Sequence, residues 1–199
     1  MIKRKLGFIG IIIAAAVTVT GCGALSKAEF SRCTISGNTL KSELFHIQAE
    51  VGSDWEFGSD SDIASLNGMS GSSASDFEKA IKENDIFYDA LCRKSTGSNF
   101  IIAVPNPDVV KSNIFTSEKA YAEATLEGVQ DIDSNASIST LTFAGKEHQA
   151  IKVTNESMGT SFKQCMVFVK SSQYVCMLTF TCFTDEELDE VMGYFKSLE

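Results

Sequence analysis

Short runs of apolar and β-branched residues alternate with clusters of Gly, Ser, Asn and Lys through most of the chain. They pair into three predicted β-hairpins, formed by 86–92 with 99–104, 137–143 with 148–154, and 161–169 with 174–183. Nearly every residue of the last pair is apolar or β-favouring, which is typical of strands in the middle of a sheet covered on both faces. Residues 39–47 predict a further strand, or a strand with a break.

Helical patterns lie between these runs. Residues 60–62, with the sequence Asp-Ser-Asp, look like an N-cap before apolar positions at helical spacing, and 76–83 predicts a second short helix. Ser117 caps a third helix, predicted over 118–128. Its inner face is expected to hold Tyr121, Ala124, Thr125 and Gly128.

The end of the chain carries the strongest helix signal. Thr184 and Glu187 have the spacing of a capping box, in which each side chain satisfies a backbone donor of the other residue. Apolar residues follow at spacings of three and four, at Leu188, Val191, Met192, Phe195 and Leu198. This pattern predicts an amphipathic helix lying on the sheet.

Hairpins with helices between them and at the end indicate an α+β fold, with a mostly antiparallel sheet and helices packed on it, rather than a parallel βαβ protein. The expected organisation is a single α+β domain over 33–199, preceded by a tether over 22–32 and a signal peptide over 1–21. We find no internal repeat.

The first residues predict export. Lys3, Arg4 and Lys5 precede an apolar stretch from Leu6 to Thr20 that is too short to span a bilayer comfortably. The sequence Val-Thr-Gly before Cys22 resembles the lipobox of bacterial lipoproteins, and this resemblance implies that the thiol of Cys22 carries a lipid. The alternative is a short uncleaved anchor with an incidental cysteine. The expected location is the extracytoplasmic face of the cell membrane.

Charge narrows the choice of partners. The chain has 17 basic and 26 acidic residues, and loss of residues 1–21 would leave 14 basic residues and a formal net charge of −12. Such a surface repels nucleic acid and anionic lipid headgroups. The Cys22 lipid would therefore attach the protein to the membrane. The expected partner is a protein or another envelope component.

Five cysteines follow Cys22, namely Cys33, Cys92, Cys165, Cys176 and Cys182. Their spacing is not that of a structural zinc site. Three of them fall in strand-like runs, where cysteine usually serves as a small buried hydrophobe. Buried thiols are therefore expected, with a Cys165–Cys176 bridge across a hairpin as the alternative.

No residue pattern predicts catalysis or a cofactor. The only histidines are His46 and His148, and His148 follows a predicted hairpin turn, where a solvated side chain is the ordinary outcome. Cys92, Cys165 and Cys176 lie in no recognisable protease context, and the chain has no Gly-x-Ser-x-Gly elbow and no phosphate-binding glycine loop.

Acidic residues and one tryptophan offer weaker candidates. Asp54, Glu56, Asp60 and Asp62 have oxygen ligands at short spacing but lack the register of a calcium loop, so a helix cap and a solvated loop explain them more simply. Glu186, Glu187, Asp189 and Glu190 are explained by helix capping and a solvent-facing side. Trp55, between two acids, is expected in the core rather than on a binding surface.

Several segments resemble small secreted lipoproteins of Gram-positive anaerobes that are similar to the PsbP-like αβα-sandwich family. These are residues 54–57 (Asp-Trp-Glu-Phe) with the following Asp-Ser-Asp-Ile segment, the helix start at 117–121, Gly145 between strands, and the ending over 174–198. The resemblance implies an αβα sandwich over roughly 37–198. Relatives of this fold act by binding, and none of their roles transfers to this chain.

The preferred hypothesis is a non-enzymatic, membrane-anchored binding or accessory module. The alternatives are a small-ligand receptor with a cleft between sheet and helices, and a hydrolase or thiol enzyme whose site is assembled from scattered residues. A pocket with a histidine, a cysteine and an acid would favour the enzyme. A roomy apolar cleft would favour the receptor, and one exposed apolar patch would favour a protein partner.

Overall fold

The main sheet has seven strands, and every neighbouring pair is antiparallel. The computed structural model describes residues 29–108, 117–157 and 160–198. The strand order is β4-β5-β6-β10-β9-β8-β7, so the two most apolar strands occupy the interior of the sheet as the sequence predicts. The strands are β4 (Trp55–Phe57), β5 (Ile86–Lys94), β6 (Asn99–Pro105), β7 (Ser137–Phe143), β8 (Lys146–Ser157), β9 (Thr160–Ser171) and β10 (Tyr174–Cys182).

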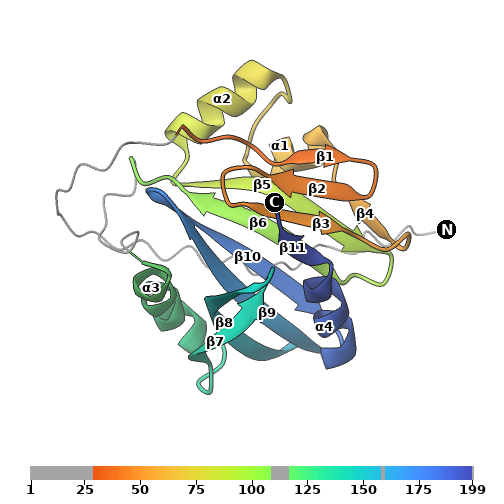
Figure 1. Cartoon of the computed structure of the whole chain (residues 1–199), viewed down its shortest axis with the longest axis vertical. Coiled ribbons are helices and arrows are strands. Elements are labelled where there is room, and N and C mark those ends of the chain that lie inside the picture. The colour runs from red at the N-terminus through yellow and green to blue at the C-terminus, as the bar shows by residue number, and fades with distance from the viewer. Residues whose placement is uncertain (1–28, 109–116, 158–159, 199) are drawn as a thin grey trace.

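A second, four-stranded antiparallel sheet covers one face of the main sheet. Its order is β1-β2-β3-β11, from β1 (Thr34–Ser36), β2 (Thr39–Ser42), β3 (Ile47–Glu50) and β11 (Phe195–Ser197). Figure 1 shows β11, from the end of the chain, beside β3 in this small sheet. The strand predicted over 39–47 is thus two strands, because the chain turns back after Ser42.

Helices pack on both sides of the main sheet. On the face opposite the small sheet lie α1 (Asp60–Leu66), α2 (Ala74–Glu83) and α3 (Glu118–Gln130). The last helix, α4 (Asp185–Gly193), packs beside the small sheet and against β9 and β10. The α+β class with a mostly antiparallel sheet is therefore confirmed.

Four phenylalanines form the centre of the core between the two sheets. Phe180 is fully buried, and its ring centroid lies 5.8 Å from Phe100, 5.8 Å from Phe143 and 5.5 Å from Phe195. These rings come from β6, β7, β10 and β11, so aromatic packing joins the C-terminal strand to the main sheet. Aromatic side chains bury more apolar surface than any others, and such contacts stabilise the fold.

The predicted C-terminal helix is too long. The helix ends at Gly193, and Phe195 begins a strand whose residues pair with β3, with Phe195 opposite Ala49 and Ser197 opposite Ile47. Phe195 is buried as expected, but as a strand residue. Helical and strand spacing cannot be distinguished over so few residues, and pairing with a distant strand decides between them.

The inner face of α3 also differs by about one position from the prediction. Its buried residues are Tyr121, Ala122, Thr125 and Val129, and the helix continues past Gly128 to Gln130. Ser117 caps the helix as predicted, because its hydroxyl accepts a hydrogen bond from the backbone N–H of Ala120 at 3.0 Å. Within the described ranges, no helix is long and apolar enough to cross a membrane. Cys22 lies outside these ranges.

Candidate functional site

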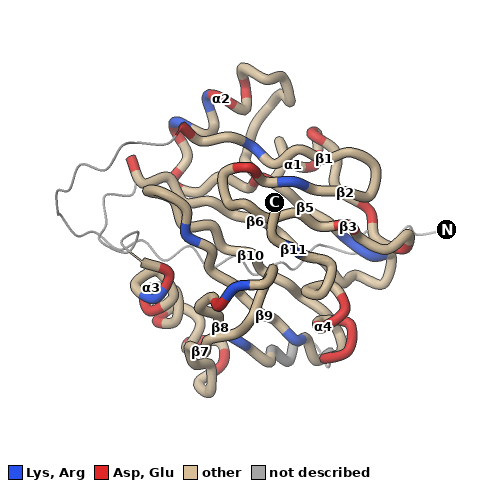
Figure 2. Tube along the Cα trace, in the orientation of Figure 1, with Lys and Arg blue, Asp and Glu red and all other residues tan. Residues whose placement is uncertain are grey.

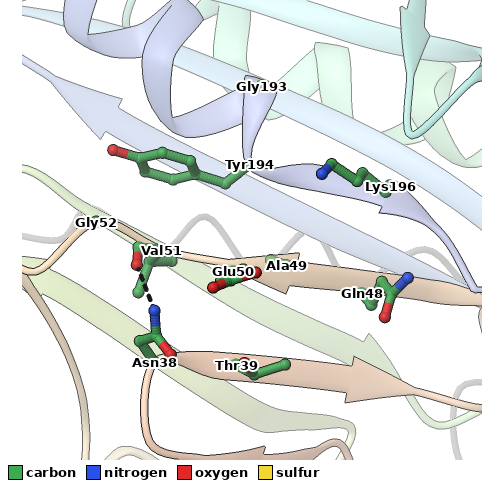
Figure 3. A pocket seen from close by; sticks show the side chains of 10 residues that line it. All are labelled: Asn38, Thr39, Gln48, Ala49, Glu50, Val51, Gly52, Gly193, Tyr194 and Lys196. Carbon is green, nitrogen blue, oxygen red and sulfur yellow. Dashed lines mark hydrogen bonds between the residues drawn. The ribbon is translucent and has the colours of Figure 1, made fainter.

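A shallow groove lies on the outer face of the small sheet (Figure 3). Its volume is about 330 Å³, at the lower end of the range for ligand pockets. Its lining residues come from two segments that are far apart in the sequence, 38–52 and 193–196. They are Asn38, Thr39, Gln48, Ala49, Glu50, Val51, Gly52, Gly193, Tyr194 and Lys196.

Strand alternation explains why polar side chains line this groove. Leu40, Ile47 and Ala49 point into the core, so their neighbours point outward. The register places Thr39 opposite Glu50, and it places Gln48 between Lys41 of β2 and Lys196 of β11. The outer face therefore presents two adjacent rows of hydroxyl, carboxylate, amide and ammonium groups.

Tyr194 forms one end of the groove, as Figure 3 shows. Its hydroxyl donates a hydrogen bond to Glu190 of α4, and burial together with that carboxylate raises the pKa of Tyr194 to about 12. A Cβ on Gly52 would lie 2.9 Å from the Tyr194 hydroxyl oxygen. Glycine at position 52 therefore lets the ring lie close to the backbone.

The opposite side of the groove is held by Asn38. Its side-chain amide donates to the carbonyl of Val51 at 3.1 Å, and its own carbonyl accepts from the N–H of Val51 at 2.9 Å. The groove thus combines an aromatic ring with amide, hydroxyl and charged groups on a rigid sheet. Such a set suits reversible binding of a polar ligand.

A partly exposed ion cluster around Lys94 lies beside Tyr194 and supports this end of the groove. The ammonium of Lys94 lies 3.0 Å from Asp54, 3.3 Å from Glu187 and 3.5 Å from Glu190. Partial burial alone would lower the pKa of Lys94, but the hydrogen bonds to Asp54 and Glu187 outweigh it and raise that pKa. Figure 2 shows the acidic residues gathered on α4 that Lys94 partly neutralises.

Glu187 does not complete the predicted capping box. The Thr184 hydroxyl accepts from the backbone N–H of Glu187 at 3.1 Å, as expected. The Glu187 carboxylate, however, accepts from the Ser98 hydroxyl at 2.5 Å and from the N–H of Phe183 at 3.4 Å. Lys94 at the end of β5 and Ser98 in the turn after it are distant in sequence from α4, and they draw this side chain away from the helix cap.

A larger cleft of about 780 Å³ lies at the end of the main sheet beside α2. Phe30 forms part of its apolar lining, with its ring centroid 5.7 Å from both Phe87 and Tyr174. The polar part of the lining includes Glu78 and Lys82 of α2. The cleft borders the ends of two described ranges, because Glu29 and Asp108 also line it.

Neither histidine lines the groove or the α2 cleft. His46 is exposed, with a φ of 52°, in the turn before β3. His148 is buried rather than solvated, because its Nδ1 lies 2.9 Å from a carboxylate oxygen of Glu118. Glu118 also accepts from the N–H groups of Gln149 and Lys170, so the pair joins α3 to β8 and β9.

The five described cysteines are free and buried. Burial is the main cause that raises the pKa of Cys92 and Cys182 to about 12 and that of Cys165 to about 11, and it also raises those of Cys33 and Cys176. Cys165 lies opposite Phe180 in the register, four positions from Cys176. That separation is about 13 Å along a strand, so the two sulfurs cannot bridge.

Three of the four acids considered as calcium ligands have separate partners. Asp54 pairs with Lys94, the Asp60 carboxylate lies 3.2 Å from Arg32, and Asp62 accepts from the N–H of Ser59 at 2.8 Å. Ser59, rather than Asp60, is the N-cap of α1. Within the described chain, no three or more His, Cys, Asp or Glu side chains are placed to hold a metal ion.

Trp55 lies in the core, as expected. It is 5% exposed and packs against Phe100, with the ammonium of Lys94 lying 5.2 Å from its ring centroid. Its indole N–H is buried and has no acceptor among the residues the structure describes. Trp55 is therefore largely covered, and Tyr194 is the aromatic residue that the groove presents.

No protein-family model matches the chain, and no curated protein matches it. Its structure is similar to a protein from Bacteroides thetaiotaomicron, with 14% identity and a TM-score of 0.44 over 83% of this chain and 50% of that one. The chain thus spans about half the length of that protein. It is also similar to cyanobacterial PsbP (CyanoP) from Synechocystis, with 8% identity and a TM-score of 0.45 over 88% and 98% of the two chains. Both TM-scores are below 0.5, so the α+β class rests on the strands and helices themselves.

Proposed function

We propose that this chain is a bacterial lipoprotein anchored by Cys22 at the extracytoplasmic face of the membrane, and that its domain binds an envelope component without catalysis. The groove around Tyr194 carries the binding part of the proposal. It presents an aromatic ring fixed by Glu190, with Glu50, Gln48 and Lys196 beside it on a rigid sheet. Hydroxyl-rich polymers such as envelope glycans offer apolar faces to a ring and hydroxyls to amides and carboxylates.

Two further observations support a binding role. The candidate nucleophiles Cys92, Cys165 and Cys176 are buried with raised pKa values, and a neutral buried thiol is a poor nucleophile. His148 makes a hydrogen bond with Glu118 that joins a helix to the sheet. These side chains contribute to the fold, whereas Glu50 and Lys196 of the groove face solvent.

The binding proposal is tested with insoluble cell-wall glycan as the probe. The native chain is expected to sediment with the glycan, and Tyr194→Ala is expected to remain in the supernatant. Tyr194→Phe keeps the ring and loses only the hydrogen bond to Glu190, so it is the matched control and should still bind. Equal sedimentation of the native chain and Tyr194→Ala would overturn the proposal.

The anchor is tested separately by fractionation of cells that express the Cys22→Ser variant. The variant is expected to leave the membrane fraction with its domain folded, because the lipid is the only strong membrane hold that the sequence predicts. Retention of Cys22→Ser in membranes would contradict lipid anchoring. It would leave the groove proposal to be judged by the glycan assay.

The α2 cleft supports a second candidate, a receptor for a small apolar ligand. Its volume of about 780 Å³ and its Phe30, Phe87 and Tyr174 lining carry this alternative. A fluorescent apolar dye is the probe. The native chain would enhance its fluorescence, and Ile81→Glu, which places a charge in the cleft wall, would abolish the enhancement. No enhancement with the native chain would remove this candidate.

A further inference from the structure

Strand β7 is the last strand at one end of the main sheet (Figure 1), and no strand among the described residues pairs with its outer side. Its seven residues pair with β8 on one side without a register shift. Among described residues, no backbone hydrogen bond outside the β7–β8 pairing involves this strand. An open row of N–H and C=O groups is a template for another strand.

The composition of β7 makes it unlike the other sheet edges. Its sequence, Ser-Ile-Ser-Thr-Leu-Thr-Phe, has no charged residue and no proline. The edge strands β1, β4 and β11 have three residues each, and β4 and β11 carry Glu56 and Lys196. Short length and charge are the usual protection of an edge against pairing, and β7 has neither.

An exposed apolar side chain lies in the segment that leads into β7. Ile132 is 39% exposed, the only large hydrophobic residue in the exposed class among those described. It lies between the end of α3 and the start of β7, and its N–H bonds to the carbonyl of Val129. Ile138 and Leu141 of β7 are themselves only partly buried. Apolar contact area therefore accompanies the open edge.

We propose that β7 pairs with β7 of a second copy of this chain, in antiparallel orientation about a two-fold axis at Thr140. This register overlaps all seven residues and places Ser139 opposite Leu141 and Ile138 opposite Thr142. Each strand then satisfies the open backbone groups of the other, and the two main sheets become one continuous sheet. The inference concerns a different surface from the proposed groove and does not depend on it.

Charge favours a second copy at this edge over other surfaces of the chain. The net charge of −9 makes two copies repel each other in most orientations. Uncharged β7 strands meet without like charges facing each other. One strand pair is smaller than a standard interface of about 1,600 Å², so the dimer is weak in dilute solution. Confinement of anchored copies to a membrane would raise their effective concentration and favour it.

Disulfide trapping tests the register. The full chain, purified in detergent, receives Thr140→Cys or Ser139→Cys and is exposed to a mild copper oxidant. Two copies of residue 140 would face each other with Cα atoms about 4.5–5.5 Å apart, within disulfide range. Two copies of residue 139 would be offset by two positions, beyond that range. We expect covalent dimers from Thr140→Cys only, and equal or absent crosslinking in both variants would overturn the proposal.

Sedimentation equilibrium tests the interface without a crosslink. Thr140→Lys would place two ammonium groups opposite each other. It is expected to raise the dimerisation midpoint, the protein concentration at which half of the chains are dimeric, by about tenfold. Thr96→Lys adds the same charge in the exposed turn between β5 and β6, away from β7, and should leave the midpoint unchanged. If Thr140→Lys and the native chain dimerise equally, or if β7 amides gain hydrogen-exchange protection only with a different protein, the proposed pairing is wrong.

Discussion

The backbone N–H of Cys33 donates a hydrogen bond to the carboxylate of Asp89 at 2.8 Å, which ties the start of the domain to the middle of β5. Asp89 is 1% exposed and lies where the register of β5 shifts against β6. Burial raises the pKa of Asp89, and Cys33 and Arg32 oppose that shift by stabilising the charged form. The side chain of Arg32 reaches the same carboxylate, with Nε at 3.4 Å. Residues 32 and 33 therefore belong to the packed structure.

Removal of this carboxylate should weaken the whole domain. Asp89→Ala leaves the buried N–H of Cys33 without an acceptor and Arg32 without its inner partner. We expect a loss of about 2–4 kcal/mol in the free energy of unfolding, measured by urea denaturation of the full chain. Asp60→Ala is the control, because Asp60 binds the same arginine with a side chain that is 65% exposed. Asp60→Ala should lower the free energy of unfolding by less than about 1 kcal/mol. Equal losses for the two variants would show that the buried hydrogen bond to Asp89 contributes no more than the exposed ion pair of Asp60.

The Glu118 carboxylate should make stability depend on acid pH. Partial burial alone would raise its pKa, but hydrogen bonds from His148, Lys170 and Gln149 outweigh burial and hold the pKa below 4.5. The unfolded chain therefore binds this proton first, and the stabilisation is present above pH 4.5 and lost as the pH falls through the folded pKa. Glu118→Gln should be less stable than the native chain by about 2 kcal/mol near neutral pH, with the difference shrinking in acid.

Urea midpoints measured between pH 3 and pH 7 would check this dependence. Glu123→Gln is the matched control, since Glu123 lies on the same helix with a side chain that is 57% exposed. Its effect should stay below about 0.5 kcal/mol at every pH. A gap between the native chain and Glu118→Gln that stays constant into acid would contradict the proposed role of the carboxylate.

Phe180 should be among the most costly core residues to truncate. It is fully buried between the two sheets and contacts three other phenylalanine rings. Phe180→Ala is expected to lower the free energy of unfolding by about 3–5 kcal/mol, because it leaves a cavity that the sheets cannot close. Thermal denaturation measures the loss, and an unchanged melting temperature would show that the sheet packing is wrong.

The five buried thiols should resist alkylation in the native state. Their pKa values are raised by burial, and the thiolate is the reactive form. Iodoacetamide at pH 8 should label none of Cys33, Cys92, Cys165, Cys176 and Cys182 in the folded protein and all five in urea. Intact mass spectrometry counts the labels. Only three labels in urea would instead reveal a disulfide.

Much of the fold could be predicted because its signals are local. The three hairpins, the Ser117 cap and the core position of Trp55 depend on neighbouring residues, and the structure confirms them. Polar groups joined across long distances could not be predicted in this way. His148 looked solvated beside its turn, but its partner Glu118 lies 30 residues earlier on a helix. Glu187 looked like part of a cap, but its carboxylate accepts a hydrogen bond from Ser98, 89 residues away.

The candidate groove had no signal in the sequence at all. Asn38, Gln48 and Tyr194 are separate and unremarkable along the chain, and they meet only because β11 returns to pair with β3. The apolar spacing around Tyr194 favoured a continued helix and did not indicate that its ring would line a groove. The α2 cleft was likewise beyond prediction, since it joins Phe30 to residues of β5 and β10.

By itself, the sequence determined the α+β class, the hairpins and the order of helices, because turn residues, caps and apolar spacing act between near neighbours. The tertiary structure alone decided which polar side chains meet, which cysteines lie far apart, and that the last residues form a strand. The physical reason is that these outcomes follow from the order and register of the strands. Strand order is set by the burial of whole sheet faces, and no local pattern contains it.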